Sequence, residues 1–166
     1  ENNVPPGVFG LVIGDRAIGQ KMAEDTRVPL VSATGSTRMG KSVAETVGKR
    51  LGKSLLELGG NNAIILSRHA NLKLAIPAVI FGAVGTCGQR CTSTRRLIID
   101  EAIYDEFVAK ISKAYESLSG RIGNPMDAST LIGPLIDKDA VANMQNSLAQ
   151  AKEQGGTVLT GGEIMQ

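Results

Sequence analysis

Tryptophan is absent from the 166-residue sequence, aromatic residues make up only 3% of it, and there are one histidine and two cysteines. A core must therefore be packed from aliphatic side chains, while the 20 glycines indicate tight turns and close backbone approaches. Two cysteines cannot form a disulfide framework, and such sparse use of cysteine is typical of a reducing compartment. These shortages favour an α/β fold over a disulfide-built or all-β one.

The sequence also lacks a surplus of one charge and a long apolar run. Its 18 basic and 16 acidic residues are interspersed, which is not the pattern of a nucleic-acid-binding surface. The longest apolar run, residues 75–84, is too short to span a bilayer, and the polar, proline-rich start does not resemble a secretory leader. We therefore expect a cytoplasmic protein with no nucleic-acid or membrane partner. Because neither end resembles a natural terminus, we also expect an internal piece of a longer protein.

Short apolar runs alternate with amphipathic stretches along the whole chain. Strands are predicted at residues 8–13, 28–33, 54–58, 63–67 and 96–100. Helices are predicted at about residues 18–24, 36–51, 72–84, 103–118 and 137–154. This alternation predicts an α/β fold of open, mostly parallel sheets with flanking helices, beginning with a strand–helix–strand unit over residues 8–33.

Single residues add detail to these elements. Gly52 is expected to end the second helix, and Asn71 to cap the third. The third helix is apolar all round, which predicts burial on every side, and Pro77 should kink it or lie near its first turn. The pair Gly59-Gly60 interrupts two apolar runs and is the candidate domain boundary.

The first motif with chemical potential is residues 34–40, Thr-Gly-Ser-Thr-Arg-Met-Gly, which follows a strand and opens a helix. Unpaired backbone N–H groups and the positive end of the helix dipole attract anions there, and glycine lets a ligand approach the backbone. The motif therefore predicts a pyrophosphate site. A capping role for Ser36 or Thr37 explains the same residues equally well. The sequence has no GxGxxG fingerprint, so ordinary Rossmann binding is not supported.

The second motif is residues 55–60, Leu-Leu-Glu-Leu-Gly-Gly. If the leucines enclose Glu57, its carboxylate becomes more basic and suits a general base, while the glycines leave room for a ligand. The alternative is that Glu57 lies on the solvent face of a strand and pairs with one of the many basic residues.

The third motif is Cys91, which follows a glycine-rich turn and stands beside Arg90. A thiolate is a strong nucleophile, and nearby positive charge and backbone N–H groups favour it over the thiol. The alternative, a small buried apolar cysteine, suits Cys87. A metal site of Cys87, Cys91 and His69 lacks a fourth ligand, so no metal is predicted. A Cys91–His69 dyad is possible in principle, but His69 stands in a polar turn and is better explained as an exposed residue.

Taken together, residues 34–37, 57–61 and 88–91 resemble, in this order and separation, the aldehyde dehydrogenase superfamily, and the resemblance extends over essentially the whole chain. It implies that residues 1–58 are the C-terminal part of an NAD(P)-binding domain and residues 59–166 the N-terminal part of a catalytic domain. It also implies that Cys91 is the nucleophile and Glu57 the general base. The cofactor-binding residues that it implies are Ser36 at the pyrophosphate and, around it, Gly19, Thr34, Gly35, Met39 and Leu58.

The resemblance implies oxidation of a small-molecule aldehyde to a carboxylic acid, through a thiohemiacetal and a thioester on the cysteine, with NAD as the cofactor and NADP not excluded. The paired asparagines after Gly60 and the run Arg95-Arg96-Leu97 look most like the antiquitin branch, which oxidises α-aminoadipic semialdehyde in lysine breakdown. Members of the family form dimers and tetramers, so a homo-oligomer is expected.

Some family features are missing or different. The oxyanion-hole asparagine and the ribose-binding lysine and glutamate of the family lie outside these residues, so this piece alone is expected to be inactive. Ala33 replaces a usual phenylalanine, and Cys87 a small residue that is not a thiol. Two alternatives stay open: a coenzyme A-acylating aldehyde dehydrogenase, which commonly lacks the glutamate, and a non-catalytic nucleotide-binding or assembly module.

Overall fold

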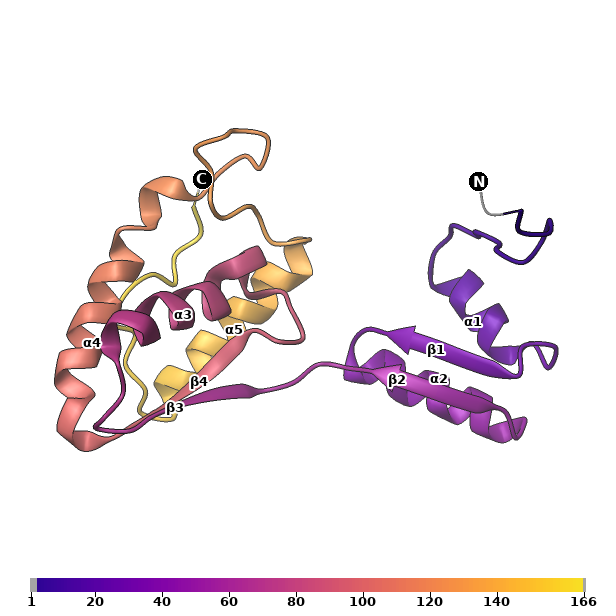
Figure 1. The fold of residues 1–166 in the computed structure, drawn as a ribbon, viewed down its shortest axis with the longest axis horizontal. Helices are drawn as coiled ribbons and strands as arrows, with labels where there is room; N and C mark the ends of the chain where they lie inside the picture. The colour runs from indigo at the N-terminus through magenta and orange to yellow at the C-terminus, as the bar shows by residue number, and fades with distance from the viewer. Residues whose placement is uncertain (1–2, 166) are drawn as a thin grey trace. The chain divides into compact units, whose positions relative to one another are not determined.

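The computed structural model describes residues 3–165 and divides the chain into two compact units, Glu1–Gly59 and Gly60–Gln166, each of which is described by itself (Figure 1). Each unit contains a two-stranded parallel sheet whose strands are joined by a helix. The predicted α/β class with parallel sheets and flanking helices is confirmed. The assignment of the units to a cofactor domain and a catalytic domain stays a prediction.

The first unit consists of two helices and two strands. In chain order they are α1 (Arg16–Glu24), β1 (Leu30–Thr34), α2 (Thr37–Lys49) and β2 (Lys53–Glu57). The strands pair in parallel from Leu30 opposite Lys53 to Thr34 opposite Glu57. Helices α1 and α2 pack against one another, and each has a buried residue, Ala23 in α1 and Val47 in α2. Arg50 strengthens this packing, because its guanidinium donates to the carbonyl oxygens of Ala23, at 2.8 Å, and Val28, at 2.7 Å.

The strand predicted at residues 8–13 is wrong. These residues are exposed and belong to no regular element; the side chains of Leu11 and Ile13 are 85% and 86% exposed. A strand forms only when another strand satisfies its backbone hydrogen bonds. Within residues 3–59, β1 pairs with β2 alone, so the strand–helix–strand unit is β1–α2–β2 instead of the one predicted over residues 8–33.

Helix α2 ends at Lys49, two residues before the predicted end at residue 51. Leu51 and not Gly52 adopts the left-handed conformation in which helices commonly end, with φ 57°. The N–H of Leu51 donates to the carbonyl of Gly48 at 2.9 Å, and that of Gly52 to the carbonyl of Val47 at 3.0 Å. These two hydrogen bonds form a Schellman motif whose left-handed position is usually glycine.

We expect Leu51→Gly to stabilise the folded protein by roughly 0.5–1 kcal/mol, because a residue with a Cβ resists the left-handed conformation and glycine does not. The Leu51 side chain is 94% exposed, so little packing is lost. The measurement is the denaturant midpoint of the full-length protein. As a control, Ala44→Gly at an exposed position inside α2 should destabilise it by about 1 kcal/mol. A lower midpoint for Leu51→Gly would contradict the expectation.

The second unit begins with its strand–helix–strand unit and continues into two long helices. In chain order its elements are β3 (Asn62–Leu66), α3 (Leu72–Val84), the 3-10 turn η1 (Gly85–Gly88), β4 (Thr94–Ile99), α4 (Glu101–Glu116), the 3-10 turn η2 (Ser119–Arg121) and α5 (Lys138–Glu153). β3 and β4 pair in parallel, with a register shift between Asn62 and Ala63. The core is formed by Leu66, Val79 and Phe107, one residue each from β3, α3 and α4.

Helix α3 is buried on one side only, so the prediction of burial all round is wrong. Val79 is buried in the core, but the side chains of Leu74 and Phe81 are each 70% exposed. The elements that contact α3 most are η1, α4 and β4, and they leave these two side chains uncovered. The predicted cap is confirmed, since the Asn71 side chain accepts from the N–H of Lys73, and Pro77 lies inside the helix. No helix within residues 3–165 has both the length and the apolarity needed to cross a membrane.

Candidate active site

The first and second motifs meet at the carboxyl edge of the β1–β2 sheet. Thr34 and Glu57 are the last residues of their strands and lie opposite one another. The N–H of Gly35 donates to the carbonyl of Glu57 at 3.0 Å, which joins the loop after β1 to the end of β2. In open α/β sheets ligands bind at this edge. The structure therefore brings the proposed phosphate-binding loop and the proposed base to one place.

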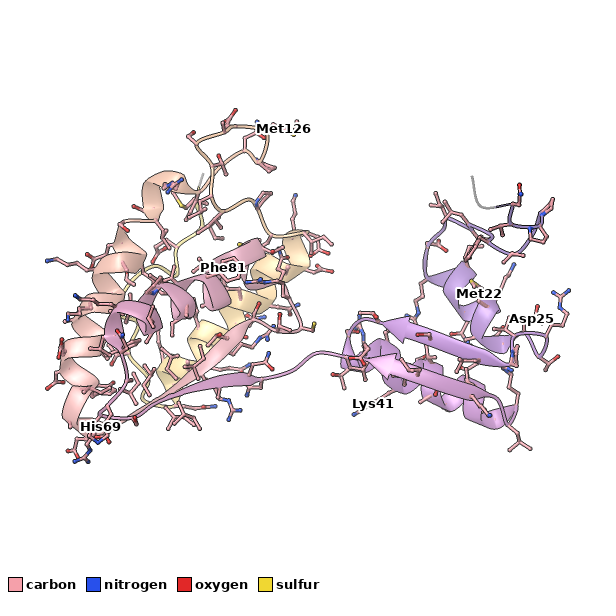
Figure 2. All side chains as sticks on the ribbon, viewed as in Figure 1. Met22, Asp25, Lys41, His69, Phe81 and Met126 are labelled. Atoms are coloured by element: carbon pink, nitrogen blue, oxygen red, sulfur yellow. The ribbon has the colours of Figure 1, made fainter. Side chains whose placement is uncertain are left out.

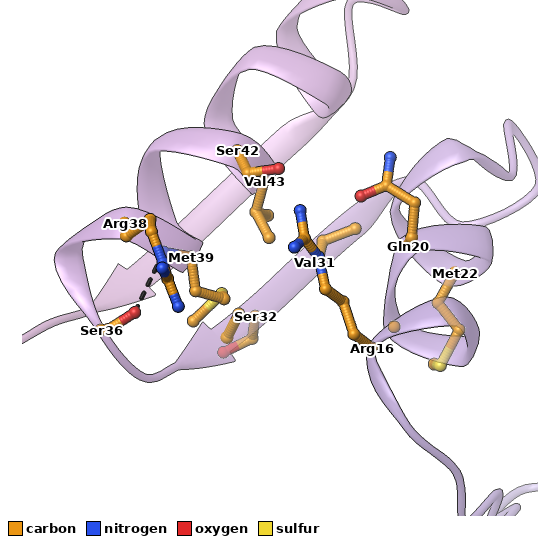
Figure 3. Close-up of a pocket in the computed structure, with 12 residues that line it drawn as sticks. Arg16, Gln20, Met22, Val31, Ser32, Ser36, Arg38, Met39, Ser42 and Val43 are labelled. Carbon is orange, nitrogen blue, oxygen red and sulfur yellow. Dashed lines mark hydrogen bonds between the residues drawn. The ribbon is translucent and has the colours of Figure 1, made fainter. Parts of the chain in front are cut away.

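Ser36 is the N-cap of α2. Its Oγ accepts a hydrogen bond from the N–H of Met39 at 3.1 Å, drawn as a dashed line in Figure 3. The predicted capping role is confirmed for Ser36, while Thr37 is the first residue of the helix. Capping by Oγ leaves other backbone N–H groups of the first turn unpaired within the helix, as at every helix N-terminus. A role in binding pyrophosphate stays a prediction.

A pocket of about 500 Å³ lies beside Ser36 and draws its walls from α1, β1 and α2 (Figure 3). Of the predicted cofactor residues, Gly19, Ser36 and Met39 line it. Thr34, Gly35 and Leu58 do not. The other lining residues are Arg16, Gln20, Met22, Val31, Ser32, Ala33, Arg38, Ser42 and Val43.

Two arginines of this pocket were missed at the level of sequence. In Figure 3, Arg16 extends from the start of α1 toward Val31 and Val43. Arg38 lies in the first turn of α2, next to the Ser36 cap. Both bring positive charge to an otherwise mostly apolar wall. Arg38 belongs to the first motif, and the predicted cofactor residue Gly19 lies in α1, but no pattern in the sequence shows that Arg16 lines the same pocket.

Leu58 and Met39 pack against glycines of the same unit. A Cβ at Gly40 would lie 2.5 Å from Leu58 Cδ2, and a Cβ at Gly35 would lie 2.5 Å from Met39 Cε. Glycine therefore permits a close approach at both positions. For Leu58 this packing against α2, and not contact with the pocket, is what the structure shows.

Glu57 is exposed, so the expectation that leucines enclose it is wrong for this unit. Side chains of a strand alternate between its two faces, and Leu56 and Leu58 are the half-buried neighbours of the exposed glutamate. The alternative position, on the solvent face of the strand, is confirmed. Within residues 3–59, however, no basic side chain forms an ion pair with Glu57. The carboxylate is accessible to water.

The two cysteines lie in different environments. Cys91 is exposed, whereas Cys87 is half-buried, and this burial raises the pKa of the Cys87 thiol. A raised pKa lowers the fraction of reactive thiolate. The prediction of a buried Cys87 is confirmed only in part, and Cys91 is the more accessible of the two thiols.

The loop that carries Cys91 is held by side chains on its backbone. The Oγ of Ser93, a residue only 2% exposed, accepts from the N–H of Arg90 at 3.1 Å. Arg95 donates to the carbonyls of Ser93 and Arg90, both at 3.1 Å. Asn62 donates to the carbonyls of Cys91, at 2.7 Å, and Ser93, at 3.0 Å. The backbone on both sides of the thiol is therefore fixed.

Arg90 does not direct its guanidinium at the loop. It donates to the carbonyl of Phe81 at 2.7 Å and lies over the Phe81 ring, 4.9 Å from the centroid. Just before it, Thr86 and Cys87 both have φ 54°, and Gly88 has φ 70°. Positive φ is costly for a β-branched residue, so this turn stores strain just before the loop that carries Cys91.

His69 cannot pair with Cys91. His69 follows the carboxyl end of β3, at one end of the second unit in Figure 2, whereas Cys91 precedes the amino end of β4. Because the two strands are parallel, the residues lie at opposite ends of the sheet, separated by strands of five or six residues, or roughly 15 Å. The dyad and the Cys87, Cys91 and His69 metal site are both contradicted. Residues 3–165 contain no group of three histidine, cysteine, aspartate or glutamate side chains placed to hold a metal ion.

Curated relatives match nearly the whole of this chain. The alpha-aminoadipic semialdehyde dehydrogenase of Mus musculus is 52% identical over 166 residues, covering 99% of this chain and 30% of the relative. Aldehyde dehydrogenase family 7 member A1 of Pisum sativum is 45% identical over 165 residues, covering 99% of this chain and 32% of the relative. The chain thus spans less than a third of the length of these relatives. The resemblance to the antiquitin branch is confirmed.

Solved structures share the fold. An NADP-dependent enzyme of E. coli superposes with a TM-score of 0.92 at 36% identity, covering 99% of this chain and 34% of that one. Betaine aldehyde dehydrogenase from Staphylococcus aureus, in complex with NAD⁺, gives a TM-score of 0.85 at 28% identity, covering 89% of this chain and 29% of that one. The family model described as the aldehyde dehydrogenase family matches residues 1–166. The chain belongs to the aldehyde dehydrogenase family.

Proposed function

We propose that the full-length protein to which this chain belongs oxidises α-aminoadipic semialdehyde to the corresponding carboxylic acid, a step of lysine breakdown. The observation that carries the proposal is an exposed thiol, Cys91, on a loop whose backbone is fixed by Asn62, Ser93 and Arg95. This site lies in a chain that is 50% or more identical to alpha-aminoadipic semialdehyde dehydrogenases of Bos taurus and Mus musculus.

The proposed cofactor is a nicotinamide dinucleotide, NAD or NADP, which would accept a hydride when bound. The pocket in the first unit fits part of such a molecule, since its volume of about 500 Å³ is in the range of small-molecule sites. Ser36 lies at a helix N-terminus, and Arg16 and Arg38 add positive charge that complements phosphate. Gly19 and Met39 would line the cofactor, and the backbone at Thr34 and Gly35 would approach it, with Leu58 packed behind α2.

In the proposed mechanism the Cys91 thiolate adds to the aldehyde carbon, and the C–S bond forms as the carbonyl oxygen becomes an oxyanion. Backbone N–H groups of the loop, with an asparagine from outside this chain, stabilise that oxyanion. Loss of hydride from the same carbon leaves a thioester on Cys91. Glu57 then takes a proton from water, the resulting hydroxide adds to the thioester, and the C–S bond breaks to release the acid and restore the thiolate.

Further properties of the protein are part of the proposal. The presence of Glu57 favours hydrolysis over transfer of the acyl group to coenzyme A. The exposed apolar side chains of each small sheet, such as Leu55 and Ile65, support the view that this chain alone is inactive. We place the protein in the cytoplasm as a homo-oligomer with a small aldehyde as its substrate.

The test is an assay of the full-length protein with α-aminoadipic semialdehyde and either NAD⁺ or NADP⁺, with and without coenzyme A. We expect carboxylate and reduced cofactor in equal amounts, a rate that does not depend on coenzyme A, and poor oxidation of hexanal, which has the chain length but no amino-acid end. Formation of an acyl-CoA would instead identify the acylating class. Dinucleotide binding without oxidation of any aldehyde would identify a non-catalytic module.

A further inference from the structure

Asn62 is the first residue of β3, and its side chain reaches the loop that carries Cys91. Its Nδ2 donates to the carbonyl of Cys91 at 2.7 Å and to that of Ser93 at 3.0 Å. A side-chain amide has two N–H donors, so both are used on this one loop. We propose that Asn62 is a positioning residue, which holds the Cys91 peptide in the geometry needed for attack on the aldehyde. This inference rests on the proposed function.

The hydrogen bond to the Cys91 carbonyl acts on the residue that carries the nucleophile. The hydrogen bond to this carbonyl restricts rotation about the Cα–C bond of Cys91. It therefore also restricts the direction in which the side chain of Cys91 points. Attack requires the sulfur close to the carbonyl carbon along a defined line, and a displacement of about 1 Å can cost 10²-fold in rate. An anchor that belongs to a strand holds more firmly than one on a loop.

A bulge in β4 completes the anchor. Asn62 pairs with Thr94 and Ala63 with Arg96, so Arg95 is an extra residue in its strand. Bulges redirect side chains, and the guanidinium of Arg95 turns back to the carbonyls of Arg90 and Ser93. Within residues 60–165, the carbonyl of Cys91 itself accepts a side-chain hydrogen bond from Asn62 and from no other residue.

The local backbone makes room for this amide. A Cβ at Gly60 would lie 3.1 Å from Asn62 Oδ1, which is tighter than most real contacts, and 3.4 Å from the Cys91 carbonyl oxygen. Asn61 provides a contrast. Its backbone carbonyl accepts from Arg96 Nε at 3.0 Å and from Nη2 at 2.6 Å, and within residues 60–165 its side chain makes no hydrogen bond to the loop. Of the two adjacent asparagines, only Asn62 therefore holds the Cys91 loop through its side-chain amide.

The experiment compares Asn62→Leu with Asn61→Leu in the full-length protein. Leucine has nearly the shape of asparagine but no donor. We expect Asn62→Leu to lower kcat for α-aminoadipic semialdehyde by roughly 10²-fold, with the KM for the dinucleotide within about twofold of wild type. Asn61→Leu should keep both values. Asn62→Ser, which retains one donor, should give an intermediate kcat.

Hydrogen–deuterium exchange provides a readout that does not need turnover. Backbone amides of residues 89–94 should exchange faster in Asn62→Leu and unchanged in Asn61→Leu. If the wild-type protein oxidised no aldehyde, the proposed function would be wrong, while the exchange result would still decide whether Asn62 holds the loop. Equal kcat and equal exchange for the two leucine variants would overturn the proposal. Loss of folding in both Asn62 variants would also overturn it, because the role would then be structural only.

Discussion

Replacing Cys91 by serine in the full-length protein is expected to abolish aldehyde oxidation, with a loss in kcat of roughly 10⁴-fold or more. A serine hydroxyl is far less acidic than a thiol, and residues 60–165 place no histidine near enough to activate it, because His69 lies at the other end of the sheet. The measurement is steady-state formation of reduced cofactor with α-aminoadipic semialdehyde as the substrate.

Cys87→Ser is the matched control for Cys91→Ser. The two cysteines are four residues apart, but Cys87 is half-buried and burial raises the pKa of its thiol. We expect this variant to retain most of the wild-type rate. Alkylation of the wild-type protein with iodoacetamide should modify Cys91 first and stop turnover at one equivalent. Similar activity in both serine variants would show that neither thiol is the nucleophile.

The second large effect is expected for Glu57→Gln. If Glu57 activates the hydrolytic water, formation of the thioester does not require it, whereas hydrolysis does. The variant should therefore give a burst of reduced cofactor close to one equivalent per site, followed by a steady-state rate that is lower by roughly 10²- to 10⁴-fold. Rapid mixing followed by a steady-state assay measures both phases.

Glu45→Gln provides the control for this experiment. Glu45 is an exposed carboxylate of the same unit, paired with Lys49 on the surface of α2. Loss of such a surface pair has little effect on stability, so both phases should match the wild type. A Glu57→Gln variant with an unchanged steady-state rate would assign the base to another residue, and one without a burst would place Glu57 in an earlier step.

Much of the secondary structure followed from local patterns. Period-four apolar residues predicted α2, and the polar residues before α2 and α3, Ser36 and Asn71, cap these helices as expected. The predictions that were wrong also came from local patterns. The run at residues 8–13 has the composition of a strand but no partner, and the apolar helix α3 is covered on one face only. Pairing and coverage depend on other parts of the chain, which a local pattern does not describe.

For the candidate site, too, the identities of the residues could be predicted from the sequence, but their surroundings could not. The identities and order of Ser36, Glu57 and Cys91 could be recognised directly, because each is a chemically distinctive residue in a short motif. The exposure of Glu57 and the position of Arg16 in the pocket could not be predicted, since both depend on how strands and helices pack. No sequence pattern marks Asn62 as different from Asn61.

The sequence by itself determined which reactive groups this protein has: a thiol, a carboxylate and a loop suited to an anion, in the order of the aldehyde dehydrogenase family. Only the tertiary structure decided how the Cys91 loop is held, because Asn62 and the two carbonyls to which it donates are 29 and 31 residues apart along the chain. Their contact depends on the parallel pairing of β3 with β4 and on the bulge at Arg95. A register shift of one residue would move every side chain of the strand to the other face and remove the contact.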